Sequence, residues 1–190
     1  MGVTVYTAPA PLIDLSEVKQ HLRVEVVDDD GLIQALLSAC TRHAEEILEQ
    51  SFVTQTLTWT LDYWEDERYA DSDGVLMVPR APLVSVTHCK YYDADDVQQT
   101  LSTDYYQVDA SEYPGRIGFT DGLALPTLST RLAPIEFRIV TGYGAASTVP
   151  KQAVAAVKMM VGNMYYHREV LPEHGAEMAL LNSMRHHGYK

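Results

Sequence analysis

The spacing of the hydrophobic positions changes twice along the chain. Up to about residue 50, and again from residue 150, apolar side chains recur at steps of three and four, as on one face of a helix. Between these stretches they alternate with polar residues, many of them threonine, as in strands with one buried face. The pattern predicts an α+β fold: a helical bundle is built from both chain ends, and a small antiparallel β domain is inserted between them. The predicted parts are residues 1–50, 51–149 and 150–190.

The N-terminal part is expected to hold an extended arm over residues 1–13 and two helices. Asp14 and Glu17 have the spacing of a capping box, in which each side chain satisfies a backbone amide at a helix start. This helix is expected to end near Arg23. A second helix is expected from Asp28-Asp29-Asp30 to about Glu49, because the helix dipole favours negative charge at the N-terminus.

The aspartate triplet also invites comparison with a calcium-binding loop. Such a loop has an invariant glycine in its middle and oxygen ligands at its first and last positions. If Gly31 took the glycine position, Val26 and Leu37 would stand at those two ligand positions. Neither side chain has an oxygen, so the triplet is interpreted as a helix start.

The central part is expected to form a series of strands. The first runs from Val53 to Tyr63, with apolar side chains alternating with threonines. Shorter strands are expected at residues 75–78, 84–92, 97–101, 105–109, 116–119 and 135–143. Several short strands at nearly regular spacing indicate a small antiparallel sheet or sandwich.

A glycine-containing turn joins the strands to the C-terminal helices. Gly142 and Gly144 allow the positive φ with which a strand turns away from its sheet, and Pro150 suits the first turn of a helix. The long helix is expected to reach about Arg168, and a last helix is expected at residues 176–185. Apolar residues form a stripe on the long helix: Val154, Val157, Val161, Met164 and Tyr165.

The charge of the chain limits the kinds of partner it can have. The formal net charge is −12, which argues against binding nucleic acid through its phosphates, because that needs Lys and Arg surfaces. Residues 150–190 differ from the rest, with five basic and three acidic residues and four of the seven histidines. This mildly basic end suits docking onto an acidic partner. The sequence has neither an apolar run long enough to span a membrane nor a signal-peptide pattern, so we expect no membrane association.

The motifs of catalytic sites do not occur in recognisable form. There is no G-x-S-x-G, and Thr141-Gly142-Tyr143-Gly144 lacks the Lys-Ser/Thr end of a phosphate-binding loop. A metal-dependent hydrolase would have to use His167, His174 and His186, and the adjacent His186 and His187 point to different helix faces. We expect no catalytic, cofactor or metal site. Cys40 and Cys89 are expected to be buried, reduced hydrophobic residues.

The twelve tyrosines include three doublets. Adjacent residues of a strand face opposite sides of a sheet, so one tyrosine of each strand doublet is expected in the core and the other outside. Outward tyrosines are frequent at protein interfaces. An alternative is a generic binding module that holds a peptide or sugar through Tyr91, Tyr92 and Tyr106.

The order of several motifs resembles a known family. Leu15-Ser16-Glu17-Val18-Lys19-Gln20-His21-Leu22-Arg23 opens the series, followed by the aspartate triplet and the strand at residues 54–62. Val78-Pro79-Arg80-Ala81-Pro82-Leu83-Val84 comes next, and Tyr165-Tyr166-His167-Arg168-Glu169 closes it. Together they are similar to the head–tail connector (adaptor, or head-completion) proteins of long-tailed phages and prophages. The ending Met184-Arg185-His186-His187 departs from the arginine-rich terminus expected there.

The resemblance implies a structural protein of the virion neck, made in the host cytoplasm. Its copies would form a ring, usually twelve-fold, between the portal protein and a stopper or tail-terminator protein, and DNA would pass through without specific binding. In such proteins the helical part builds the ring and the C-terminal segment docks on the portal. The expected interface residues are Tyr165, Tyr166, Arg168, Met184, Arg185, His186, His187 and Tyr189.

Overall fold

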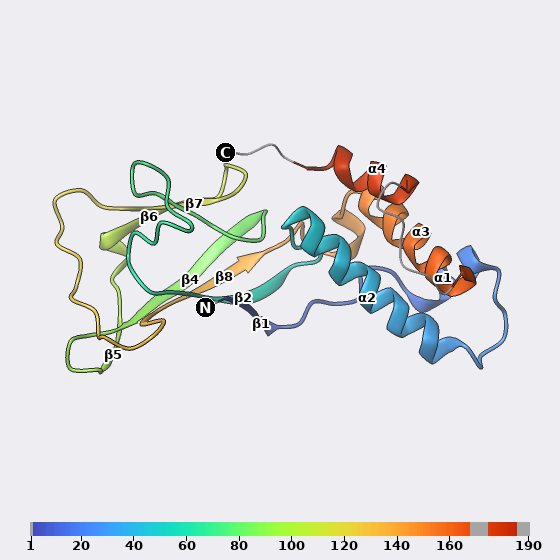
Figure 1. Ribbon diagram of the computed structural model, residues 1–190, viewed down its shortest axis with the longest axis horizontal. Helices are drawn as coiled ribbons and strands as arrows, with labels where there is room; N and C mark the ends of the chain where they lie inside the picture. Colours follow the sequence, from blue (N-terminus) through green and yellow to red (C-terminus); the bar gives the residue numbers. More distant parts are fainter. Residues whose placement is uncertain (1, 168–174, 186–190) are drawn as a thin grey trace. The chain divides into compact units, whose positions relative to one another are not determined.

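The computed structural model describes residues 2–167 and 175–185. Helices and antiparallel strands occupy separate parts of the chain, which confirms the predicted α+β class (Figure 1). The chain divides into two compact units. We call residues 10–53 with 143–190 the helical unit, and residues 1–9 with 54–142 the sheet unit.

Four helices build the described part of the helical unit: α1 (Leu15–Leu22), α2 (Asp30–Leu48), α3 (Lys151–His167) and α4 (Ala176–Ser183). α3 packs against α2 and α4, so the two chain ends share one core. The buried side chains of this core include Leu22, Ile33, Phe52, Met160 and Leu181. The predicted stripe of α3 is confirmed in part: Val157 and Val161 are buried, whereas its other members, Val154, Met164 and Tyr165, are only partly buried. Because short helices are weak alone, this shared core is what stabilises them.

The ends of α1 and α2 lie where the sequence predicts them. Arg23 and Glu49 follow the helices in the left-handed conformation, and the amide of each is bonded to carbonyls of the last turn. The predicted capping box is wrong. Among the described residues the Asp14 side chain makes no cap hydrogen bond, and Glu17 instead accepts from Lys158 of α3, with Nζ 2.7 Å from Oε1. This bond to the Lys158 ammonium lowers the pKa of Glu17 and ties α1 to α3.

The sheet unit contains two antiparallel sheets. The larger has the order β1-β2-β8-β4-β5 and the smaller β3-β7-β6. The strands of the larger sheet are β1 (Val3–Thr7), β2 (Gln55–Leu61), β4 (Leu83–Tyr92), β5 (Gln98–Thr100) and β8 (Ile135–Thr141). Those of the smaller are β3 (Leu76–Met77), β6 (Tyr106–Asp109) and β7 (Arg116–Phe119). Short 3₁₀ turns lie at Thr103–Tyr105 in this unit and at Ala146–Thr148 in the helical unit.

The core of the sheet unit is aromatic. Trp59 of β2 is fully buried and meets Tyr69 edge-on and Phe137 of β8 at 5.1 and 5.5 Å between ring centroids. The alternation predicted for β2 is confirmed, since Gln55, Leu57, Trp59 and Leu61 are its buried residues. Tyr63 is the exception: β2 ends at Leu61, and the Tyr63 side chain is 70% exposed.

The first nine residues, which the pattern groups with the N-terminal helices, lie in the sheet unit. They form β1, which pairs antiparallel with β2 in a register that sets Val3 opposite Trp59. The paired residues are 49 to 56 positions apart in sequence, so no local pattern reveals the pairing. The expected arm is therefore an edge strand of the larger sheet.

Both cysteines are buried and free, as the sequence predicts. Cys40 is in the helical unit and Cys89 in the sheet unit. Burial raises the pKa of the Cys40 thiol to about 11 and that of Cys89 still further. In the described part of the chain, none of the helices combines the length and apolar character that a membrane crossing requires.

Candidate functional site

The predicted interface residues fall at two ends of the helical unit. Tyr165 and Tyr166 lie at the end of α3, beside the start of α2. Met184 and Arg185 follow α4 and contact the last turn of α2 and the residues after it. α2 has 19 residues, so its ends are about 27 Å apart. Arg168, His186, His187 and Tyr189 lie outside the described residues.

The first end joins α3 to the loop between α1 and α2. The Tyr165 hydroxyl donates to Asp29 Oδ2 at 2.5 Å, and the Tyr166 hydroxyl donates to the carbonyl of Leu22. The two rings meet edge-on with centroids 5.2 Å apart. These contacts hold the loop onto the last turn of α3, so both tyrosines support helix packing within one copy.

A lysine fixes the same loop from the other side. Lys19 Nζ donates to the carbonyl of Val26 at 2.9 Å and forms an ion pair with Asp30 in the first turn of α2. The acidic residues predicted to favour the helix start therefore also bind specific partners: Asp29 accepts from Tyr165 and Asp30 pairs with Lys19. The sequence did not predict these contacts of Asp29 and Lys19, because their partners come from other helices.

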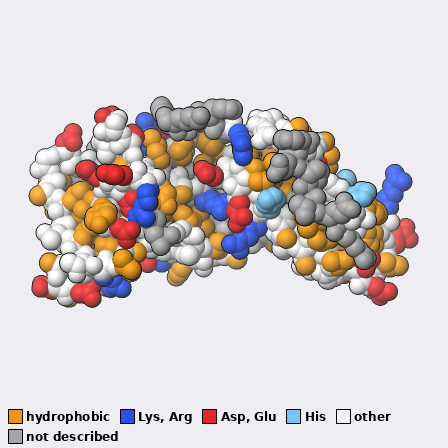
Figure 2. Space-filling view, viewed as in Figure 1, with side chains coloured by type: hydrophobic (Ala, Val, Ile, Leu, Met, Phe, Trp, Pro, Cys, Tyr) orange, Lys and Arg blue, Asp and Glu red, His pale blue; other side chains and the backbone are white. Residues whose placement is uncertain are grey.

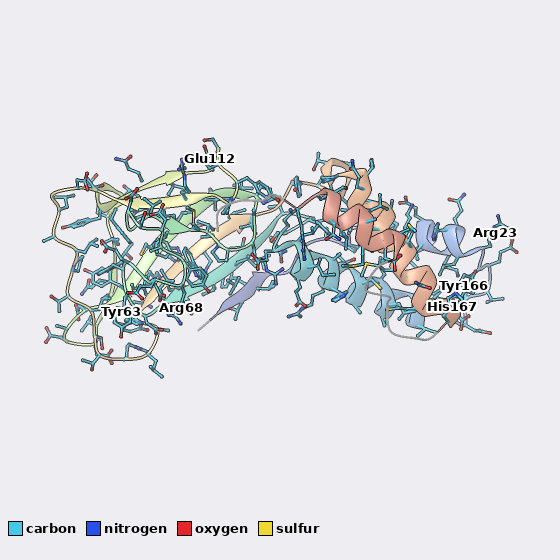
Figure 3. All side chains as sticks on the ribbon, turned by 45° about the horizontal axis from the view of Figure 1, so that its top comes forward. Arg23, Tyr63, Arg68, Glu112, Tyr166 and His167 are labelled. Carbon is cyan, nitrogen blue, oxygen red and sulfur yellow. The ribbon has the colours of Figure 1, made fainter. Side chains whose placement is uncertain are left out.

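Beyond these contacts, the same end presents apolar surface. Tyr166 is 61% exposed, and Val26 and Val27 are 58% and 71% exposed. Figure 3 shows Arg23, Tyr166 and His167 at this end of the unit. We call Arg23, Val26, Val27, Tyr166 and His167 the helical tip. Large exposed side chains gathered at one place are typical of a protein interaction site.

The second end is organised by Gln50, which sequence reasoning missed. Its buried side chain accepts from the Tyr143 hydroxyl at 2.9 Å and donates to the carbonyl of Met184 at 3.3 Å. Arg185 donates to the carbonyl of Ile47 at 3.3 Å. Gln50 therefore connects the chain after α2, the turn before α3 and the end of α4. A lone glutamine after a helix gives no sequence signal of this role.

Those residues of the alternative functions that the structure describes do not assemble into a site. Tyr106 is buried, and burial raises its pKa. Tyr91 packs edge-on against Trp64 at 5.5 Å, and the Arg131 guanidinium lies 3.7 Å from the Tyr92 ring centroid. Within residues 2–167 and 175–185, no group of His, Cys, Asp and Glu side chains could hold a metal ion. His174 and His186 lie outside these ranges.

Removing the Tyr165 hydroxyl should weaken the helical unit. Tyr165→Phe is expected to lower its free energy of unfolding by about 1–2 kcal/mol, because Asp29 loses a charge-assisted donor. Urea unfolding followed by far-ultraviolet circular dichroism measures this. Asp29→Ala combined with Tyr165→Phe should cost less than the sum of the two single losses. Additive losses would show that the hydroxyl and the carboxylate do not interact.

These features indicate a class of protein. The two tyrosines, Gln50 and the Lys19–Asp30 ion pair stabilise the helical unit, and the large side chains of the helical tip are exposed. An exposed apolar surface of this kind is typical of proteins that bind other proteins. The described structure therefore indicates a protein that forms part of an assembly.

Comparison with known proteins identifies the family. The model of the phage gp6-like head-tail connector proteins matches residues 12–112, just over half of the chain. The chain belongs to this family, which is one of structural virion proteins and not of enzymes. The resemblance expected from the motifs is thereby confirmed. No curated protein matches the sequence.

Solved structures show the same fold. The chain is similar to a protein in the virion of a native gene transfer agent particle, with a TM-score of 0.78 and 21% identity, covering 97% of this chain and 95% of that one. The neck of the native particle computed with C12 symmetry gives the same values. The neck of the empty particle computed with C6 symmetry gives a TM-score of 0.77 and 22% identity at the same coverage. The fold that the described residues share with these proteins therefore extends beyond the part that the family model matches.

Proposed function

We propose that the protein is a subunit of an adaptor ring in the neck of a phage-type particle. The ring would lie between the portal protein and the stopper or tail-terminator protein, and it would extend the channel through which DNA passes. The observation that carries the proposal is the family match over residues 12–112. A neck structure with the same fold was computed with C12 symmetry, which supports twelve copies.

The charge of the sheet unit suits a passage for DNA. Its residues include fourteen acidic and six basic side chains, a formal charge of 6 − 14 = −8. Figure 2 shows acidic side chains spread over the visible face of this unit, with fewer Lys and Arg between them. Bound phosphates would hold DNA in place, whereas a surface of like charge lets DNA slide.

The two ends of the helical unit have separate expected roles in this ring. The helical tip would contact a neighbouring subunit through Tyr166 and the two exposed valines, with Arg168 nearby in sequence. The segment from Met184 to Tyr189, with Arg185, His186 and His187, would dock on the portal. Its basic character contrasts with the acidic remainder of the chain.

Native mass spectrometry and negative-stain imaging of the chain with and without purified portal protein test the proposal. We expect a closed ring of twelve copies on the portal. Tyr166→Ala should weaken ring assembly at least ~10-fold, because a buried interface tyrosine is commonly a binding hot spot. Arg168→Ala and removal of residues 186–190 should weaken portal attachment or ring assembly.

Two controls separate assembly from folding. Tyr166→Phe loses the hydroxyl bond to Leu22 but retains the ring that a neighbour would contact, so it should assemble almost normally. Arg42→Ala changes a highly exposed residue in the middle of α2 and should have no effect. A chain that stays monomeric in the presence of portal would contradict the proposed function. Normal assembly by Tyr166→Ala would contradict the role of the helical tip.

A further inference from the structure

The larger sheet has a polar face opposite its aromatic core. Strand register places residues of this face in two rows, because directly paired residues share one side of a sheet. One row is Thr4, Thr58, Arg138 and His88, and the other is Thr60, Glu136, Lys90 and Thr100. We call Lys90, His88, Arg138, Glu136 and the intervening Thr58 and Thr60 the cationic sheet face. It holds two formal cations and a single carboxylate, in a unit that carries −8 overall.

The donors of this face are only partly used. Arg138 lies against the Tyr6 ring, 3.5 Å from its centroid, and donates to Glu136 at 2.7 Å. Its buried Nε has no hydrogen-bond partner among the described residues, and the buried Nε2 of His88 lies 3.7 Å from Glu136 Oε1, too far for a hydrogen bond. Lys90 forms no ion pair there. Buried donors without partners are rare, so they mark a place where an acceptor from another molecule would be stabilised.

The number of cations decides between kinds of partner. The affinity of a protein for nucleic acid grows with the number of phosphates that its Lys and Arg side chains neutralise, and here one of the two cations is already paired with Glu136. A partner that presents a few carboxylates at defined positions fits this face better. An acidic protein segment with an exposed aromatic residue fits best, because Tyr6 is exposed beside Arg138.

The same unit carries such a segment at residues 63–73, which we call the acidic loop. Tyr63 is exposed at its start, and the carboxylates of Glu65, Glu67 and Asp73 are exposed. None of these three carboxylates forms an ion pair within the described residues. The loop thus combines an aromatic side chain with acceptors that have no fixed partner.

Internal bonds fix the shape of the acidic loop. Arg68 donates to Asp66 and, at 2.7 Å, to Asp62, and the Arg68 guanidinium lowers the pKa of Asp66. Asp71 accepts from the amides of Asp73 and Val75 at 2.9 and 3.0 Å. Figure 3 labels Tyr63 and Arg68 along the lower edge of the sheet unit. A loop held in one shape loses little entropy on binding.

We propose that the cationic sheet face of one copy receives the acidic loop of the next copy. The inference rests on the proposed ring and specifies one of its subunit contacts. Face and loop are different patches of one unit, so the contact is head-to-tail, the type of interface that closes a ring. Lys90 and Arg138 would bind the Glu65 and Glu67 carboxylates, and Tyr63 would pack beside Tyr6.

A charge exchange tests the contact in the full-length chain. Lys90→Glu and Glu67→Lys should each reduce ring assembly at least ~10-fold, because like charges then meet at every interface. The double variant Lys90→Glu with Glu67→Lys restores opposite charges and should assemble within ~3-fold of the natural chain. Asp121→Lys, the same charge change at another exposed acid of the sheet unit, should assemble normally. Native mass spectrometry with portal, at low and high salt, measures the ring.

Each outcome decides between explanations. If the single variants fail and the double variant is not restored, Lys90 and Glu67 do not meet each other across the interface and the proposal is wrong. If all variants assemble like the natural chain, this contact is wrong while the ring remains. If the natural chain forms no ring with portal, ring and contact fail together. The neutral variants Lys90→Gln and Glu67→Gln, with smaller expected losses, replace any charge-reversal variant that does not fold.

Discussion

Trp59→Ala is expected to lower the free energy of unfolding of the sheet unit by about 3–5 kcal/mol, the largest loss we predict for this unit. The indole is fully buried and contacts the Tyr69 and Phe137 rings. It also lies in the row that joins Val3 of β1 to Phe137 of β8. Truncation would therefore leave a cavity where three strands meet.

Urea unfolding followed by near-ultraviolet circular dichroism measures this loss. Trp59→Phe is the matched control, with an expected cost of less than half that of the alanine variant. The indole N–H has no hydrogen-bond partner among the described residues, so replacing it with a phenyl ring removes no bond. A loss below about 1 kcal/mol for Trp59→Ala would show that the aromatic cluster is not the centre of this core.

Phe52→Ala should have the corresponding effect on the helical unit, with an expected loss of about 3–5 kcal/mol. Phe52 is fully buried. Its amide donates to Glu45 Oε1 at 2.7 Å, and its carbonyl accepts from the amide of Tyr143 at 2.9 Å. These bonds fix the backbone, so neighbouring groups cannot easily move to fill the cavity.

Urea unfolding of this variant is followed by the loss of the α-helical signal in far-ultraviolet circular dichroism. Phe52→Leu retains most of the apolar volume and should cost less than about 1.5 kcal/mol. Similar losses for the alanine and leucine variants would argue against cavity formation. Phe52→Ala should impair ring assembly because its subunits are less stably folded. Tyr166→Ala should impair ring assembly although its subunits are folded.

The strongest elements could be predicted because their signals are local. The apolar stripe of α2 and the alternation of β2 repeat over many residues, and the structure has both elements within a few residues of the predicted positions. The breaks at Arg23 and Pro150 were also visible in the sequence. Such features depend on side-chain spacing and backbone preference, which a sequence records directly.

The features that the sequence did not predict correctly depend on contacts between residues far apart in sequence. β1 forms a strand because it pairs with β2. The Glu17 side chain accepts a hydrogen bond from the Lys158 ammonium and not from the backbone amide at the helix start. The Tyr165 hydroxyl binds Asp29, 136 residues earlier. The sequence predicted Tyr165 and Tyr166 as contact residues but not these partners, because nothing local distinguishes a hydroxyl bonded within one copy from a hydroxyl that meets another.

The division of the helical unit between the two chain ends has a consequence for synthesis on the ribosome. α1 and α2 are made soon after β1, but their main partner α3 begins only at Lys151, after all the strands of the described residues have been translated. The apolar face of α2 is thus left uncovered in the nascent polypeptide while the sheets already have all their strands. Chaperone binding should therefore concentrate on this helix until the last forty residues leave the exit tunnel.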